Sequence, residues 1–520
     1  MKRSPLPDGG DIVFLCVFYL LMVVVPDLVL SDGSTGWHLV TGQYIIENLR
    51  IPHRDLISYT FPNKAWVPYE WLFDVVAALL VKLGGLKLLA LAAAAAIAGL
   101  FLALYEDMRR TGCHWLIALA LTVIGALASS PHWLARPHLF TLFGVYMVSR
   151  TLETFHRDRL SASRTIFTLG LTMLVWSNAH PGFLFGFAIV LIYLASETVT
   201  AVVLSGGDES RRATKRAGTL LAAAVVMTGA ALSNLNGLAL YPYLANYLRQ
   251  TSVLSLMAEV KPPTFQGQLY STSLELLFAS IVVGLATSRR RPRLGQLLVM
   301  LAFAHLALAH VYTVELFVIV SLPVIAGLFA ESDLPALTGS GRLGHAVLLT
   351  PLVRGWQVAA ERFNAVESRC TMHLVPITVV AVLAVSCIAA GPIPGVRPLV
   401  ASQFSPKTKP MATLEFIERA RLPWNRGFNL DNWGGYIRYR TGQRVFIDDR
   451  LDFYGQEFYL EYVQMINAQA EWHRLLDEYH IQWVLTPKDT LLAARLAQEP
   501  DWQLKAQDQA AYLFVRRTAP

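Results

Sequence analysis

The chain has 520 residues, of which 54% are hydrophobic and only 16% are charged, and its mean hydropathy is +0.43. These values exclude an ordinary soluble protein built from several domains. The formal charge is +7, but Lys and Arg fall between apolar segments, which indicates membrane topology and not nucleic-acid binding.

Eleven segments approach the roughly 20 apolar residues that a membrane-spanning helix needs. They are 12–31, 87–105, 115–131, 138–152, 165–178, 183–204, 217–233, 273–288, 294–310, 311–330 and 371–391. The first follows Met1-Lys2-Arg3 and lacks a small-residue cleavage site, so we interpret it as an uncleaved span. The four cysteines show no metal-ligand spacing, and we expect all of them to be free.

The basic connections define the topology. They contain Arg109-Arg110, the stretch 156–164, the stretch 211–216, the stretch 289–293, and Arg342, Arg354, Arg362 and Arg369. All of them are cytoplasmic if the N-terminus is inside and the C-terminus outside. This assignment requires 71–84, which is short and carries Asp74, to be a surface-lying or re-entrant helix; the alternative is a true span with the remainder inverted.

The composition changes after Gly391 to that of a small soluble domain. Residues 411–420 and 461–479 favour helices, whereas 436–440 and 444–448 alternate like paired strands around Thr441-Gly442. Two further strands are predicted at 481–485 and 511–515. The predicted fold is therefore an α-helical polytopic membrane domain, 1–391, followed by an extracytoplasmic α/β domain, 392–520.

The predicted outer loops gather the polar residues suited to chemistry. The first loop, 32–86, carries Asp32, His38, Asp55 and Glu70. A carboxylate just outside a span can deprotonate an acceptor hydroxyl or hold a divalent cation, and Asp32 is the first candidate. The alternatives are that Asp32 caps a helix, that His38 packs beside Trp37, and that Asp55 pairs with Arg54.

Other predicted turns on the same face carry cations and amides. His132, Arg136 and His138 suit a phosphate group, or alternatively a lipid headgroup. Asn178, His180 and Asn236 line two further turns, where helix capping is the alternative. Within the spans, His305 and His310 are more typical of buried structural histidines, and His310 is a candidate partner for Glu315.

In the C-terminal domain, the candidate functional motifs are a Trp433-Gly434-Gly435-Tyr436 turn and the sequence Asp448-Asp449-Arg450. A structural turn is the alternative for both. Adjacent acids on a strand point to opposite faces, so at most one of Asp448 and Asp449 faces a site.

These motifs resemble the bacterial multi-span glycosyltransferases of the C-type (GT-C) superfamily. The resemblance rests on 32–38, Ile51-Pro52, 66–72, Arg136-Pro137-His138, 178–182 and the C-terminal domain, and it covers the whole chain. Trp433 to Tyr436 with Asp448 is distantly similar to a Trp-Trp-Asp-Tyr-Gly region of oligosaccharyltransferases. Ser34 stands where many relatives carry a second acid, which weakens the case for a metal in this loop.

The resemblance implies transfer of a sugar from a polyprenyl-phosphate-linked donor to a glycan, lipid or protein acceptor at the outer face of a bacterial cytoplasmic membrane. Asp32 would be the general base, and Arg136 with His132 or His138 would neutralise the leaving phosphate. His38, Asp55, Glu70, Asn178, His180 and Asn236 would contact substrate, and Trp433, Tyr436, Asp448 and Arg450 would serve the acceptor. Mg²⁺ or Mn²⁺ is the one cofactor to consider.

Two other functions compete with this one. A non-catalytic component of a polysaccharide or glycolipid assembly system would use the same clefts to hold a lipid-linked glycan. A transporter would need polar residues through the bilayer, and Glu315, His305 and His310 are too few for a continuous path.

Overall fold

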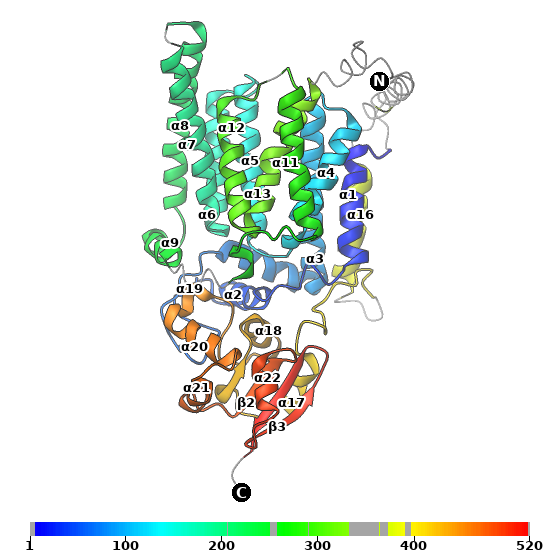
Figure 1. The fold of residues 1–520 in the computed structure, drawn as a ribbon, viewed down its shortest axis with the longest axis vertical. Helices are drawn as coiled ribbons and strands as arrows, with labels where there is room; N and C mark the ends of the chain where they lie inside the picture. Colours follow the sequence, from blue (N-terminus) through cyan, green and yellow to red (C-terminus); the bar gives the residue numbers. More distant parts are fainter. Residues whose placement is uncertain are drawn as a thin grey trace.

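The computed structural model describes residues 6–204, 206–249, 257–289, 291–331, 363, 373–390 and 397–517. A bundle of long helices carries a small α/β domain at one end, and α1 begins at the other end (Figure 1). The bundle helices are α1 (Gly9–Tyr19), α3 (Trp71–Arg110), α4 (Trp115–Ser129), α5 (His138–His156), α6 (Ala162–Ala179), α7 (Phe183–Val203), α8 (Asp208–Leu232), α11 (Leu269–Thr287), α12 (Leu294–Ala309), α13 (Val314–Ala330) and α16 (Leu374–Ala389).

We call the end that meets the C-terminal domain the domain end, and the opposite end, which carries Arg109, Arg110 and Arg157, the basic end. Shorter helices lie between or beyond these elements. They are a π-helical turn at Leu20–Val24, α2 (Thr35–Asn48), α9 (Leu240–Arg249) and the 3₁₀ turns Ser130–His132, Gly237–Ala239, Ala258–Val260 and Val311–Thr313.

Every predicted span is largely helical where the structure describes it. Among the described residues, six helices could cross a membrane by length and composition: 71–110, 115–132, 183–203, 208–232, 269–287 and 311–330. The apolar helices at 9–24, 294–309 and 374–389 are shorter. A mostly helical bundle is thus confirmed, whereas eleven spans and an inside N-terminus stay predictions. Residues 371, 372 and 391 of the last predicted span, and the basic stretch 342–362, lie outside the described residues.

Helix α3 is two helices joined at a break. Gly84 and Gly85 leave helical geometry, and the φ of +72° at Gly85 is one that glycine adopts without strain. Residues 71–83 therefore form a short helix before the long span, as the sequence predicted. Helix α2 lies across the domain end of the bundle (Figure 1).

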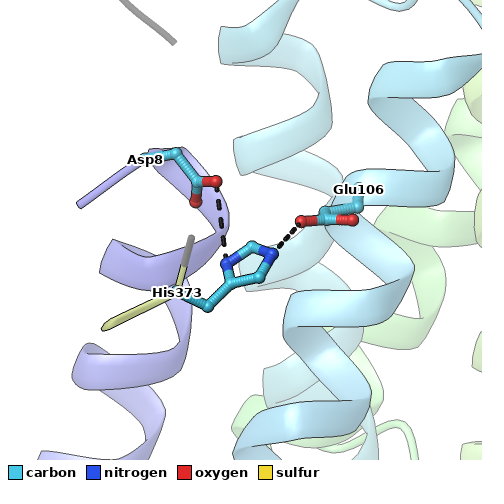
Figure 2. Close-up of side chains that lie close together, drawn as sticks. All are labelled: Asp8, Glu106 and His373. Atoms are coloured by element: carbon cyan, nitrogen blue, oxygen red, sulfur yellow. Dashed lines mark ion pairs between the residues drawn. The ribbon is translucent and has the colours of Figure 1, made fainter. Parts of the chain in front are cut away.

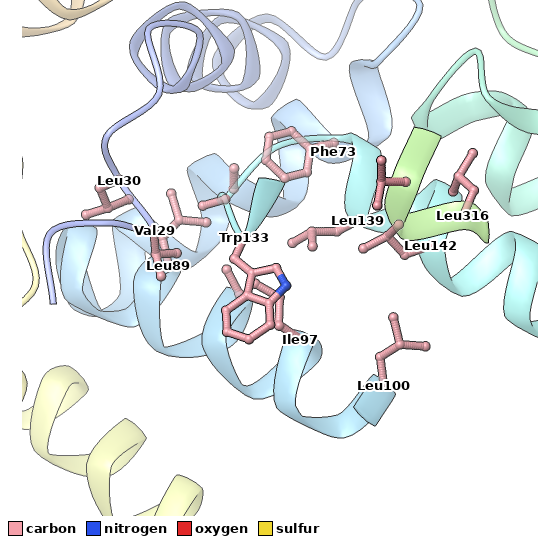
Figure 3. Packing of buried hydrophobic residues seen from close by; sticks show 14 of the residues in the cluster. Val29, Leu30, Phe73, Leu89, Ile97, Leu100, Trp133, Leu139, Leu142 and Leu316 are labelled. Atoms are coloured by element: carbon pink, nitrogen blue, oxygen red, sulfur yellow. The ribbon is translucent and has the colours of Figure 1, made fainter. Parts of the chain in front are cut away.

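The core of the bundle surrounds α3 and α13. In the most apolar stretch of each helix, 67% of the residues are buried in α3 and 78% in 311–330, which includes α13. The share is 22% in α8, which lies at the edge. The alanine-rich part of α3 keeps its surface flat, so neighbouring helices approach closely. Trp133 lies beside Ile97 in this core, and Leu89 lies beside Val29 and Leu30 (Figure 3).

The C-terminal domain contains a four-stranded sheet in the order β1-β2-β4-β3. Its strands are β1 (Gly427–Asn429), β2 (Trp483–Pro487), β3 (Trp502–Gln507) and β4 (Ala511–Arg516). β1 pairs in parallel with β2, while β4 is antiparallel to both β2 and β3. The helices are α17 (Met411–Arg419), α18 (Asp431–Thr441), α19 (Leu451–Tyr454), α20 (Gln456–Ile466), α21 (Trp472–Glu478) and α22 (Leu491–Leu496).

Several predictions for this domain are confirmed and others are wrong. The helix near 411–420 and the strands near 481–485 and 511–515 are present. The predicted hairpin around Thr441-Gly442 is absent from the described domain, because 431–441 forms α18 and buries Trp433, Tyr436 and Ile437 at helical spacing. Trp433 to Gly435 therefore lie inside a helix and not in a turn. The predicted helix 461–479 is divided between α20 and α21.

The first predicted outer loop packs directly on the C-terminal domain. The hydroxyl of Tyr59 donates to the carbonyl of Gly427 at 3.0 Å, and that of Thr60 to the carbonyl of Phe446 at 2.7 Å. Residue 58 also forms a parallel β-bridge with residue 445. Residues that are far apart in sequence are in this way brought together at the domain end.

Candidate active site at the domain end

Arg136 lies between two carboxylates at the domain end. Its Nε is 3.4 Å from Oδ2 of Asp32, and its Nη1 is 3.0 Å from Oε2 of Glu259. Burial opposes the charge of Arg136, but the attraction of Asp32 and Glu259 outweighs it and raises the pKa of the guanidinium. Burial alone would raise the pKa of Glu259, and the charge of Arg136 instead holds it below its usual value.

Local structure fixes the two partners of this pair. Oδ2 of Asp32 accepts the backbone N–H of Ser34 at 3.0 Å and also the Ser34 hydroxyl, immediately before α2 begins. Arg136 lies in the turn before α5, and the N–H of Ala135 donates to the carbonyl of Val29 at 2.8 Å. This bond joins the turn to the segment that precedes Asp32.

His132, Arg136 and His138 each lie close to Glu259 or Glu315. Nε2 of His132 is 3.4 Å from Oε2 of Glu259. Nε2 of His138 is 2.7 Å from the carbonyl oxygen of His132 and 3.9 Å from Oε1 of Glu315. The partner of Glu315 is therefore His138 and not His310, whose Nδ1 faces the carbonyl of Val260.

A second, more buried group joins His38, Glu70 and His180. Nε2 of His38 is 3.9 Å from Glu70, and Nε2 of His180 is 3.5 Å from the other Glu70 oxygen. Burial raises the pKa of Glu70 well above its usual range and lowers that of His38. Burial and the charge of Arg136 lower the pKa of His180 to about 3.

These residues are held in place by bonds from the helices behind them. Nδ1 of His38 lies 2.6 Å from Oδ1 of Asp74, and Nδ1 of His180 lies 2.7 Å from the Thr141 hydroxyl. Both imidazoles consequently present Nε2 toward Glu70. A protonated carboxyl and an unprotonated imidazole can each donate or accept hydrogen bonds without placing a net charge in the site.

The C-terminal domain covers the site through α18 and the segment after α18. The indole N–H of Trp37 donates to Oδ1 of Asp449 at 2.8 Å. Burial raises the pKa of Asp449 well above its usual range, and the charge of Asp32 adds to the effect. Nζ of Lys409 donates to the carbonyls of Asp32 and Asn432, at 3.0 and 3.2 Å.

Asp55, Asp448 and Arg450 form a buried ion-pair cluster next to Asp449. Nη2 of Arg450 is 2.7 Å from Asp55, its Nε is 2.7 Å from Asp448, and the Tyr454 hydroxyl donates to Asp448 at 2.7 Å. Of the two adjacent acids, Asp449 faces the site and Asp448 faces inward. The structure thus turns Asp55, Asp448 and Arg450 toward the protein interior.

The remaining predicted residues also bond to the protein. The Trp433 indole donates to the carbonyl of Thr408, and Tyr436 is buried against Phe404. Oδ1 of Asn178 accepts the Trp71 indole N–H at 3.0 Å, and Nδ2 of Asn236 donates to the carbonyl of Pro68 at 3.3 Å. The two amides bind the short helix of α3 and the segment before it; these two bonds are tertiary contacts and not helix caps.

Four residues of the site were not among the sequence candidates: Glu259, Asp449, Lys409 and Asp74. Asp449 had a signal, because it is one of two adjacent acids, but Asp448 was selected. Glu259 and Lys409 have no distinctive local pattern. Their significance arises only where distant loops meet.

The acids at the domain end do not fit a divalent cation. A guanidinium already lies between Asp32 and Glu259, so fixed positive charge occupies the space that a metal would share with them. A different group, Asp8, Glu106 and His373, does have ligand atoms close enough to share an ion (Figure 2). It lies at the basic end, remote from Asp32, and Oδ1 of Asp11 is 2.7 Å from Nδ1 of His373.

No protein-family model and no curated protein matches the sequence. The fold is nevertheless similar to two solved structures. The archaeal oligosaccharyltransferase AglB from Archaeoglobus fulgidus, in complex with an inhibitory peptide and a dolichol-phosphate, aligns with 92% of this chain and 69% of its own, at 11% identity and a TM-score of 0.54. ArnT from Cupriavidus metallidurans, bound to undecaprenyl phosphate, aligns with 97% of this chain and 98% of its own, at 12% identity and a TM-score of 0.50.

The chain therefore shares its overall fold with both structures, in agreement with the resemblance seen in the sequence motifs. At these identities the similarity establishes the fold of a polytopic membrane protein. The chemistry at the domain end is argued below from the residues of this chain.

Proposed function

We propose that the protein is a membrane glycosyltransferase that moves a sugar from a polyprenyl-phosphate-linked donor to an acceptor at the domain end. The observation that carries this proposal is the guanidinium of Arg136 beside the carboxylate of Asp32, where an apolar helix bundle ends. A lipid phosphate needs a fixed cation where the apolar bundle ends, and an acceptor hydroxyl needs a nearby base. The lipid phosphates bound by AglB and ArnT support the same assignment.

The reaction would be a direct displacement at the sugar. The acceptor oxygen forms a bond to the anomeric carbon, the bond from that carbon to the phosphate oxygen breaks, and the acceptor proton passes to Asp32. The lipid phosphate leaves with the bonding electrons, and Arg136 with His132 or His138 neutralises it. Attack opposite the leaving group inverts the anomeric centre.

Asp32 and Asp449 would then have different roles. Burial and the charge of Asp32 favour a protonated Asp449, which can donate a hydrogen bond to a substrate hydroxyl while Asp32 remains the base. Glu70, whose pKa burial also raises, would bind a sugar hydroxyl together with His38 or His180.

The buried residues would act by positioning the site. Asp55, Asp448 and Arg450 hold the segment that presents Asp449, while Asn178 and Asn236 fix the segment that presents Glu70. We therefore propose that Trp433, Tyr436 and this cluster support the acceptor site from behind. The domain end would face the outside of a bacterial cytoplasmic membrane.

One observation favours the alternative, a non-catalytic component that binds a lipid-linked glycan. Asp32 already accepts two bonds from Ser34 at the start of α2, as a purely structural residue would. The two functions predict different effects of Asp32→Asn, because only an enzyme needs the carboxylate as a base.

The test uses the full chain purified in detergent. Native mass spectrometry would measure binding of undecaprenyl phosphate to the wild type, Asp32→Asn and Arg136→Ala, with Arg212→Gln at the basic end as the matched control. Release of undecaprenyl phosphate from a panel of undecaprenyl-phosphoryl sugars would measure turnover by the same variants.

We expect the wild type and Asp32→Asn to bind the lipid, and Arg136→Ala to bind one equivalent fewer than the wild type. Asp32→Asn should lose turnover by a factor of roughly 100 or more, the typical contribution of a general base. Absence of lipid binding by folded wild type would refute the proposal. Binding without release of undecaprenyl phosphate from any sugar donor would favour the non-catalytic function.

A further inference from the structure

A polar cavity lies at the basic end of the bundle, away from Asp32. Its volume is about 210 Å³, and its walls come from α3, α5, α7, α12, α13 and the segment after α5. A rise of about 1.5 Å per residue along α5 places Thr154, in the cavity wall, about 24 Å from His138. The cavity is therefore a separate compartment from the candidate active site.

The rim of the cavity carries more positive than negative charge. Four arginines, 110, 150, 157 and 159, line it with two carboxylates, Asp107 and Glu153, which leaves a formal charge of +2. The carboxylates are already satisfied: the Tyr146 hydroxyl donates to Asp107 at 2.8 Å, and the Tyr193 hydroxyl donates to Glu153 at 2.9 Å. Arg110, Arg150 and Arg157 form ion pairs with Glu106, Asp107 and Glu153, so in the described part of the chain the charge of Arg159 is the one left for an anion.

Two polar groups of the lining have unused hydrogen-bonding capacity. The hydroxyl of Ser149 is buried and has no hydrogen-bond partner in the part of the chain that the structure describes. Arg159 forms no ion pair with any described carboxylate, whereas Arg150 is 3.1 Å and Arg110 is 2.9 Å from Asp107. A ligand with acceptor oxygens would pair with Arg159.

The floor of the cavity is apolar. Ile319, Val320, Pro323 and Val324 of α13 form it with Val299 of α12. Ile319 lies about 16 Å along α13 from the last residue, Ala330, so the floor extends well into the bundle. Pro323 has no amide hydrogen, which leaves the carbonyl of Ile319 without its usual helical donor.

We propose that this cavity binds the phosphate group of an amphiphile, with its apolar chain along the floor of α13. Arginine matches phosphate through paired N–H donors, and basic pockets between membrane helices are suited to phosphorylated headgroups. A free anion would leave the apolar floor unfilled, and an uncharged lipid would leave the arginines uncompensated. A phosphate monoester on a prenyl or acyl chain satisfies both parts.

The test measures binding of geranyl phosphate, geraniol and inorganic phosphate to the full chain in detergent by native mass spectrometry and titration calorimetry. Arg136→Ala serves as the background, because it removes the phosphate ligand proposed at the domain end. On that background, Arg159→Gln removes an arginine without breaking an ion pair, Val320→Trp fills the floor, and Arg212→Gln is the control outside the cavity. Thermal unfolding confirms that each variant is folded.

We expect one geranyl phosphate to remain bound to Arg136→Ala, with affinity reduced roughly tenfold or more by Arg159→Gln or Val320→Trp and unchanged by Arg212→Gln. Inorganic phosphate and geraniol should each bind far more weakly. Equal affinity for inorganic phosphate would overturn the apolar part of the assignment, and insensitivity to Arg159→Gln would overturn its position. If the wild type and Arg136→Ala each bind one equivalent of geranyl phosphate, the proposed phosphate site at Arg136 is refuted, and the proposed site in the basic-end cavity is supported.

Discussion

Replacing Gly36 with alanine should separate the C-terminal domain from the active site. Gly36 lies on α2 where α2 meets α18, and a Cβ atom built there overlaps the carbonyl of Gly435 and comes within 2.6 Å of the Tyr436 nitrogen. Both groups belong to the backbone, so they cannot move aside by rotation as a side chain can. Ordinary contact begins near 3.4 Å, so the helices must move apart by about 1 Å.

That displacement has a predictable cost. Overpacking of a close interface typically destabilises by about 1–3 kcal/mol. The movement also reaches the site, because Trp37 follows Gly36 and donates to Asp449, while Lys409 bridges Asp32 and Asn432. We expect Gly36→Ala to unfold earlier and to lose turnover by a larger factor than its stability loss alone would produce.

Gly99→Ala is the matched control. Gly99 is inside α3, and a Cβ atom there meets nothing within 4 Å, so alanine should stabilise the helix by about 0.5–1 kcal/mol. Unfolding of both variants would be followed by SDS titration in mixed micelles, together with release of undecaprenyl phosphate. If Gly36→Ala proved as stable and as active as Gly99→Ala, the close contact between α2 and α18 would not hold the site together.

Three further predictions concern charged groups. A double-mutant cycle of Arg136→Gln and Glu259→Gln, measured by SDS unfolding, should give a coupling energy of about 1–3 kcal/mol for this partly buried pair; additive single effects would contradict the ion pair. Because the pKa of His180 is lowered from 6.5 to about 3, the folded state resists protonation, so its contribution is full above pH 6.5 and is lost as pH falls toward 3. The wild type should lose up to about 2 kcal/mol more than His180→Gln between pH 7 and 5, and equal pH profiles would refute the burial argument. Lys409→Met should lower stability by about 1–3 kcal/mol by leaving the carbonyls of Asp32 and Asn432 without a donor, and unchanged unfolding would show that those bonds contribute nothing.

The sequence by itself determined the class of the protein. Long apolar segments can satisfy their backbone hydrogen bonds only as helices in a membrane, so composition alone indicated a helical bundle. The break before the long span was also visible, since 71–84 is short and ends at Gly84-Gly85. The resemblance around Asp32 and Arg136 indicated the GT-C fold and identified two residues that lie together.

Only the tertiary structure decided which polar groups meet and which face inward. Asp448 and Asp449 are equivalent in a local pattern, and the path of the chain after α18 turns one toward Arg450 and the other toward Trp37. The stretch 436–440 alternates like a strand, yet it lies in α18, whose apolar side chains are buried at helical spacing and whose Gly435 packs against Trp37 of α2. Glu259 gains its role only because its loop reaches Arg136. Such outcomes depend on contacts between distant segments, whose energies a local pattern does not contain.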